Sequence, residues 1–138
     1  MTAHEIRRLD LAELREAAIE RMVRLFYERG LADAVLGPIF REHIHDWEPH
    51  IRVVCDFWSG VIAGTGRYKA NAYAPHMKLR FEPVAFGHWL ATFESAANDC
   101  LEPADAQTAI RVAHHMAQSF KAGLFPFTDK QGRPSRLP

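Results

Sequence analysis

One stretch, from Asp46 to Leu79, restricts most strongly what this chain can fold into. It begins as a helix, because Asp46 is a good N-cap, Pro49 falls in the first turn, and the next proline is Pro75. Apolar side chains recur at helical spacing on two adjoining stripes, so more than half of the helix circumference is apolar. The stripes are Trp47, Ile51, Val54, Trp58 and Val61, and beside them His50, Val54, Phe57 and Val61. Such a helix has more than one neighbour, and a ligand can be one of them.

The rest of the sequence predicts an all-α fold. Helical periodicity runs from Asp10, which forms a possible capping box with Glu13, to about residue 29. Short turns are expected around Gly37-Pro38, and a glycine-containing loop leads to a turn that carries His76. Two further helices begin at Glu82-Pro83 and at Glu102-Pro103. No alternation typical of β-strands is present, so we expect four substantial helices in one domain, 1–138, with flexible ends at 1–9 and 125–138.

Composition excludes several classes of partner. The 17 basic residues are balanced by 17 acidic ones, which argues against nucleic acid or an anionic membrane as the main partner. Neither a signal peptide nor a run long enough to span a bilayer is present, so a cytoplasmic location is expected. Cys55 and Cys100 each fall on the apolar side of an expected helix and are predicted to be reduced, buried thiols.

A group of residues with haem-binding chemistry lies around the 46–79 stretch. A haem needs one strong axial nitrogen, a slot of apolar and aromatic side chains, and cations or hydroxyls at its propionates. His76 can supply the nitrogen, and Tyr27, His50 and Trp89 can donate hydrogen bonds to a gas ligand. The candidate propionate partners flanking His76 are Arg67, Tyr68, Lys69 and Lys78. Each residue alone is more often structural, and the combination is what indicates haem.

Several segments at characteristic spacings resemble the truncated haemoglobins, specifically the third (P-type) group. They are Phe26-Tyr27, Leu36 to Phe40, Asp46-Trp47 with His50, Phe57-Trp58, Gly64 to Tyr68, His76 with Leu79, and Trp89-Leu90 with Phe93. The resemblance implies a two-over-two helical sandwich around haem b with His76 as the proximal iron ligand. It implies Tyr27, His50 and Trp89 on the distal side, although periodicity alone makes Tyr27 an edge residue. The other expected haem contacts are Phe40, Val54, Phe57, Trp58, Arg67, Tyr68, Lys78, Leu79 and Phe86.

Four functions compete at this point. The first is reversible binding of oxygen or another diatomic gas (carbon monoxide, nitric oxide) by a monomer or weak oligomer served by a reductase partner. The second is an enzyme on the same haem, acting on peroxide or nitric oxide, although no acid-base carboxylate accompanies the donors. Glu42-x-x-His45 suggests a di-iron bundle, but that site needs a second such pair and two more glutamates. A helical interaction scaffold would leave the His76 segment unexplained.

Overall fold

The computed structural model describes residues 1–70, 76 and 81–136. Five helices and one small β-hairpin make up this part of the chain. In chain order the elements are α1 (Ala3–Ala32), α2 (Leu36–His43), α3 (Trp47–Ala63), α5 (Pro83–Cys100), α6 (Pro103–Leu124), β1 (Phe127–Thr128) and β2 (Pro134–Ser135). None of the helices in these residues is long and apolar enough to cross a membrane.

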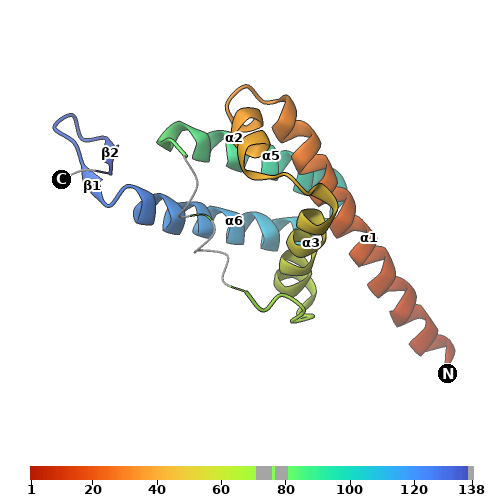
Figure 1. The fold of residues 1–138 in the computed structure, drawn as a ribbon. Helices are drawn as coiled ribbons and strands as arrows, with labels where there is room; N and C mark the ends of the chain where they lie inside the picture. The colour runs from red at the N-terminus through yellow and green to blue at the C-terminus, as the bar shows by residue number, and fades with distance from the viewer. Residues whose placement is uncertain (71–75, 77–80, 137–138) are drawn as a thin grey trace.

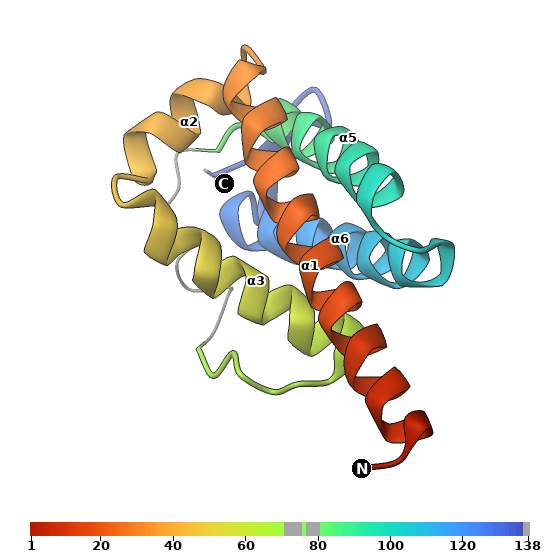
Figure 2. The ribbon, with the colours of Figure 1, turned by 90° about the vertical axis from the view of Figure 1, so that its right-hand side faces the viewer.

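The helices form two layers of two. α1 packs against α3 in one layer and α5 against α6 in the other, and the layers meet through α1 on α5 and α3 on α6. Figure 2 shows α1 crossing in front of α6, with α2 at the edge of the body, where the chain leads into the start of α3. The largest fully buried side chains are Ile19, Met22, Val23, Leu36, Ser59 and Phe93. The two-over-two architecture expected from the sequence is therefore confirmed.

The start of α1 differs from the prediction. The helix begins at Ala3, because Thr2 caps it and forms a capping box with Glu5. A start after Asp10 is therefore wrong, although flexibility of 1–9 stays a prediction. The first turns project beyond the body (Figure 1). As a result, Leu11 and Leu14, which periodicity places on the inner face, are 59% and 65% exposed.

Residues 36–43 form a helix, where only turns were predicted. The Asp33 carboxylate accepts hydrogen bonds from the backbone N–H groups of Val35 and Leu36, which caps the helix from outside. Position 37 needs a glycine, because a Cβ there would lie 2.6 Å from the carbonyl oxygen of Leu31. The prediction missed this helix because Gly-Pro was interpreted as a turn.

The other helices begin near the predicted residues. Pro83 and Pro103 occupy the first turns of α5 and α6, and Asp46 is the N-cap of α3, although its carboxylate makes no capping hydrogen bond. Gly64 ends α3 in the left-handed conformation, with φ of 68°. These positions fix the ends of the helices that surround the cavity.

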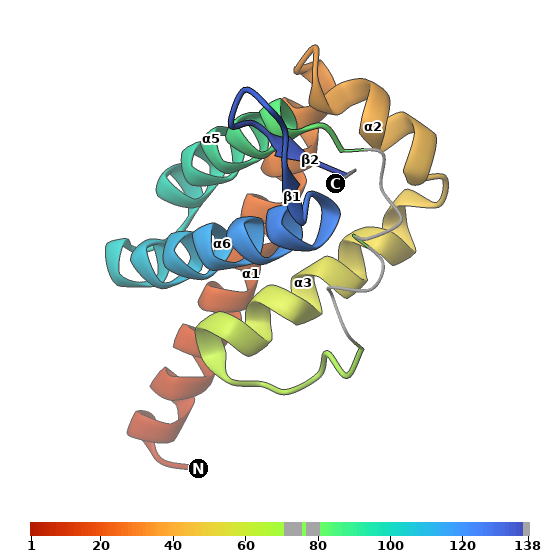
Figure 3. The same cartoon turned by 90° about the vertical axis from the view of Figure 1, so that its left-hand side faces the viewer.

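The C-terminal segment contains a small antiparallel hairpin that the sequence did not predict, and flexibility of 125–138 stays a prediction. Phe127 pairs with Ser135 and Thr128 with Pro134. Figure 3 shows the hairpin above the end of α6 and beside the start of α5. Arg136 holds it there, since its guanidinium donates a hydrogen bond to the Phe81 carbonyl and lies over the Phe125 ring.

Candidate functional site

A cavity of about 490 Å³ lies between α1, α2, α3, α5 and α6. Its walls are mostly aliphatic and aromatic, with a few polar groups converging on it. The lining residues are Tyr27, Ile39, Phe40, His43, Ile44, His50, His76, Phe81, Phe86, Trp89, Ala117, Phe120 and Leu124. An apolar cavity of this size with few polar groups is typical of a cofactor or ligand site.

Tyr27 and His50 meet across the cavity from two helices. The Tyr27 hydroxyl oxygen lies 2.7 Å from His50 Nε2. Tyr27 lies near the C-terminal end of α1 and is only 9% exposed, so the predicted edge residue is in fact buried. Burial raises the pKa of its phenol, with a smaller contribution from Cys55, and the hydroxyl therefore remains a hydrogen-bond donor at neutral pH.

His50 lies in the first turn of α3 and is half-buried. Burial lowers the pKa of its imidazole, and the nearby His76 lowers it further. Both effects favour the neutral ring, which has one N–H and one acceptor nitrogen. The pair Tyr27–His50 is consequently a neutral hydrogen bond whose partners can each donate to a third group.

An aromatic cluster fixes the ring of Tyr27. Phe40 and Trp47 meet the Tyr27 ring edge-on, each at 5.3 Å between centroids. Gly30 allows Phe40 to approach, since a Cβ at Gly30 would lie 2.4 Å from a Phe40 ring carbon. This explains a glycine inside α1, where the sequence suggested the end of the helix.

His76 reaches the cavity from the connection between α3 and α5. It is half-buried, and its imidazole stacks on Phe120 of α6 with 4.4 Å between ring centroids and 12° between planes. The cavity thus brings together His76, His50, Tyr27 and Trp89, four residues selected from the sequence. Phe40 and Phe86, two predicted haem contacts, line it as well.

Trp89 enters the cavity wall from α5, where two phenylalanines hold its indole. The ring lies parallel to Phe93 at 5.9 Å and edge-on to Phe26 at 6.1 Å. This packing fixes the plane of the indole from behind. Trp89 is half-buried, so part of its surface remains open.

Four other predicted haem contacts lie outside the described lining of the cavity. Trp58 is buried and stacks on Phe93 at 4.5 Å, so it belongs to the core between the layers. Phe57 packs edge-on against Tyr68 at 5.3 Å, away from the lining residues. Val54 is half-buried against the core. Periodicity identified the apolar stripes of α3 but not the element that each stripe faces.

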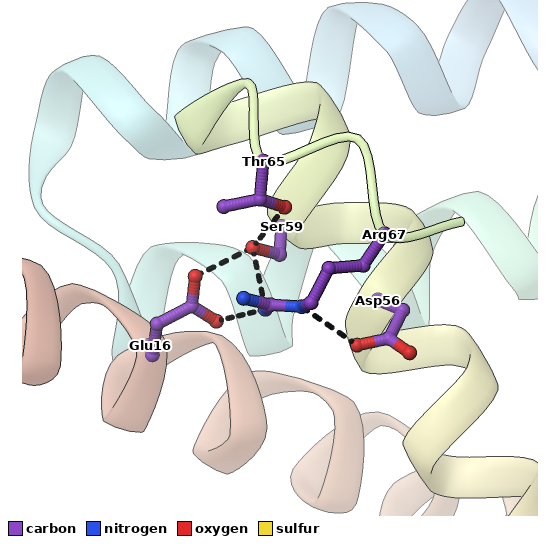
Figure 4. Close-up of polar contacts among 5 residues, drawn as sticks. All are labelled: Glu16, Asp56, Ser59, Thr65 and Arg67. Carbon is purple, nitrogen blue, oxygen red and sulfur yellow. Dashed lines mark hydrogen bonds and ion pairs between the residues drawn. The ribbon is translucent and has the colours of Figure 1, made fainter. Parts of the chain in front are cut away.

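Arg67, proposed above as a propionate partner, is engaged elsewhere. Figure 4 shows its guanidinium between Asp56 of α3 and Glu16 of α1. The guanidinium also donates to Ser59 Oγ at 2.9 Å. Ser59 is fully buried; its hydroxyl lies 2.5 Å from Glu16 Oε1 and 2.8 Å from the Thr65 hydroxyl. We call these five residues the Glu16–Arg67 cluster, and its contacts remove Arg67 from the cavity.

The two lysines proposed as propionate partners are not among the described residues that line the cavity. Lys69 is exposed and is not among the lining residues. Lys78 and Leu79 lie outside the described residues. Within the described part of the chain, no cluster of three or more His, Cys, Asp or Glu side chains could hold a metal ion, so the di-iron alternative gains no support. Both cysteines are free thiols, and burial raises the pKa of Cys55 to about 11.

The sequence missed several lining residues. Those not selected as site residues are Ile39, His43, Ile44, Phe81, Ala117, Phe120 and Leu124. Helical periodicity puts Phe120 and Leu124 on the inner face of the last predicted helix, which identifies them as core residues but not as cavity wall. Ile39 and His43 of α2 were missed because no helix was expected there, and a helix would have put these two residues on one face.

Comparisons with known proteins agree with this geometry. The chain is 27% identical over 119 residues to the group 3 truncated hemoglobin ctb of Campylobacter jejuni, covering 83% of this chain and 94% of that protein. The crystal structure of a group III truncated hemoglobin from Campylobacter jejuni matches with a TM-score of 0.69 and 28% identity, over 76% of this chain and 87% of that one. The chain is a homologue of the group III truncated haemoglobins. No family model matches the sequence.

Homology to the truncated haemoglobins implies a haem cofactor. The residues of the cavity fit that cofactor. The walls offer aromatic and aliphatic contacts for a flat macrocycle, and imidazoles enter from more than one element. One buried nitrogen, His43 Nε2, has no hydrogen-bond partner among the described residues, as expected where a bound group completes the site.

Proposed function

We propose that this globin binds a diatomic gas reversibly at the iron of a haem b, with His76 as the proximal ligand. When bound, the haem supplies an iron with one open coordination position. His76 is the candidate ligand because it enters from its own segment and its ring is held flat against Phe120, while His50 is already paired with Tyr27. Metal-bound histidine uses a neutral nitrogen, with the other ring N–H held by a second partner.

The observation that carries the proposal is the Tyr27–His50 pair, 2.7 Å apart inside an apolar cavity that also contains His76. A buried phenol that keeps its proton can donate to a gas ligand that acquires negative charge, and such charge-assisted bonds are strong. His50 can then act as a gate, because it lies in the first turn of its helix and is only half-buried. Trp89 can add a second donor from α5.

Gas binding is favoured over catalysis by the composition of the cavity wall. Among its described lining residues, no aspartate or glutamate is present that could move protons to or from a reacting group. The polar groups are a phenol, an indole and imidazoles, which suit hydrogen bonding to a ligand. A reductase partner and a cytoplasmic location stay predictions from the sequence.

The test replaces His76 in the purified protein. We expect the wild-type protein to show a Soret band and reversible spectral changes with oxygen and carbon monoxide. His76→Ala should lose most of its haem, and added imidazole should restore part of the absorption. His115→Ala is the matched control, since His115 is exposed on α6. Full haem occupancy and an unchanged spectrum in His76→Ala would remove the proximal assignment, and a colourless wild-type protein would remove the function.

A further inference from the structure

His43 is a polar group of the cavity that the distal and proximal assignments do not use. It is the last residue of α2 and lines the cavity. Its Nε2 is buried and makes no hydrogen bond in the described structure. The nearby carboxylate oxygen of Glu42 is 4.0 Å away, which is beyond hydrogen-bond distance. A buried nitrogen without a partner destabilises a protein, so its presence indicates a partner that arrives with a ligand.

The other polar groups of the cavity already have a partner or a proposed role. Tyr27 and His50 are bonded to each other. His76 is stacked on Phe120 and is the proposed iron ligand. Arg67, expected from the sequence to bind a propionate, is held by Glu16 and Asp56. Among the described residues, Arg67 is therefore not available to the two carboxylates of a haem.

We propose that the His43 imidazole donates a hydrogen bond to a propionate carboxylate of the haem; this inference rests on the proposed function. Its position suits that role, since 26% of the side chain is exposed and the residue therefore lies at the rim of the cavity. Carboxylates stay at such a rim, because moving an ionised group into an apolar interior is costly. Rotating the His43 imidazole by 180° about its Cβ–Cγ bond exchanges the positions of its nitrogen and carbon atoms. Either ring nitrogen can therefore face the propionate.

The test separates the carboxylate contact from any other effect of His43. The apoprotein is reconstituted with iron protoporphyrin IX or with its dimethyl ester, whose capped carboxyl groups carry no charge. Transfer of each haem to an excess of an acceptor apoglobin is then timed by absorption. The variants are His43→Leu, which removes the donor, and His43→Gln, which keeps an N–H donor. His45→Leu is the control, two residues away on the exposed surface.

With the native haem, His43→Leu should release haem about tenfold faster or more, as for a lost hydrogen bond to a charged group. His43→Gln should recover part of the difference, and His45→Leu should match the wild type. With the dimethyl ester, all four proteins should release haem at similar rates. An unchanged rate in His43→Leu with native haem would overturn the inference, as would an equal acceleration with both haems. Loss of a low-spin bis-imidazole spectrum in His43→Leu would overturn it too, by making His43 an iron ligand.

The two proposals fail in different ways. If the wild-type protein takes up no haem and shows no Soret band, the proposed function is wrong and the His43 contact falls with it. If haem binds normally and His76→Ala loses it, but the His43 variants show no dependence on the carboxylates, only the His43 contact is wrong. The same absorption measurements therefore distinguish both cases.

Discussion

α1 and α3 are joined at two places, and the two contacts differ in how completely their polar groups are satisfied. Near the start of α3, Tyr27 and His50 share one neutral hydrogen bond beside the cavity. Near its end, the Glu16–Arg67 cluster joins two carboxylates, a guanidinium and two hydroxyls through several bonds (Figure 4). The first contact leaves donors that can turn to a ligand. In the second contact, each of the five residues already has a hydrogen-bond partner within the cluster.

This difference suggests separate roles. A saturated polar cluster stabilises the arrangement of helices, because any change leaves a charged or buried partner without its bond. A pair with one bond can exchange it for a bond to a bound gas at little cost. Function is therefore expected at the Tyr27–His50 pair and stability at the Glu16–Arg67 cluster, although both join the same helices.

The largest expected effect is on oxygen release from Tyr27→Phe. This change keeps the buried ring and removes only the hydroxyl, so no cavity is created. A charge-assisted hydrogen bond contributes roughly 1.5–3 kcal/mol, so oxygen dissociation should accelerate at least about tenfold. Carbon monoxide carries far less charge in its complex and should dissociate at nearly the wild-type rate. Stopped-flow displacement of each gas measures both rates.

Tyr68→Phe is the matched control for that experiment, since Tyr68 packs on Phe57 away from the described cavity lining. If Trp89 compensates, the double variant Tyr27→Phe with Trp89→Phe should show a larger effect than the two single changes predict. An oxygen rate that stays at the wild-type value in the double variant would show that neither residue is the donor.

The next effect in size is on stability, at the other contact. Ser59 is fully buried and bonds to Glu16, Thr65 and Arg67. Ser59→Ala should lower the free energy of unfolding by about 1–3 kcal/mol, because partners of a buried hydroxyl lose a bond. Urea unfolding followed by circular dichroism provides the value. Ser95→Ala on α5 is the control, since Ser95 is exposed and its hydroxyl accepts one hydrogen bond, from Arg29. A loss as small as that of the control would mean that the cluster is not stabilising.

A smaller effect is expected for His50→Leu. If His50 gates access to the cavity, removing its imidazole should change the rate of gas association more than the rate of dissociation. Laser photolysis of the carbon monoxide complex gives the association rate, and stopped-flow displacement of the bound gas gives the dissociation rate. If dissociation of oxygen instead accelerates most, His50 is the principal donor and Tyr27 its support.

The smallest effect concerns acid stability away from both contacts. A hydrogen bond from His88, together with the backbone N–H of Leu36, lowers the pKa of Asp33 below its ordinary 3.8. A lowered carboxyl pKa adds stability above pH 3.8, and this contribution is lost as the pH falls through the native-state pKa. Asp33→Asn should therefore flatten the decline of unfolding free energy below about pH 4. If the unfolding free energy of Asp33→Asn declines as steeply as that of the wild type, other carboxyl groups cause the loss of stability in acid.

The sequence predicted most of the helices and about half of the cavity. Pro83 and Pro103 fix local backbone geometry, so the starts of α5 and α6 could be predicted from nearby residues. His50 and His76, the proposed distal and proximal histidines, were selected with the help of a resemblance at characteristic spacings. The start of α1 was missed because the sequence offers two capping-box patterns, Thr2 with Glu5 and Asp10 with Glu13, and only the first of them forms a capping box in the structure.

The assignment of Arg67 shows what sequence alone could not provide. An arginine near His76 in the chain was expected at the cofactor, but Glu16, which binds it, lies 51 positions earlier in the chain. Ion pairs between distant segments depend on how helices cross, and periodicity does not encode that. His43 was missed for the opposite reason, since its local helix was interpreted as a turn.

The most direct test of the contrast between the two contacts measures oxygen dissociation and unfolding free energy on the same pair of variants. Tyr27→Phe should accelerate oxygen release at least about tenfold and cost only about 0.5–1.5 kcal/mol of stability, the usual contribution of one neutral hydrogen bond. Ser59→Ala should lose about 1–3 kcal/mol of stability and release oxygen at the wild-type rate. An acceleration of oxygen release in Ser59→Ala as large as in Tyr27→Phe would contradict the separation of roles.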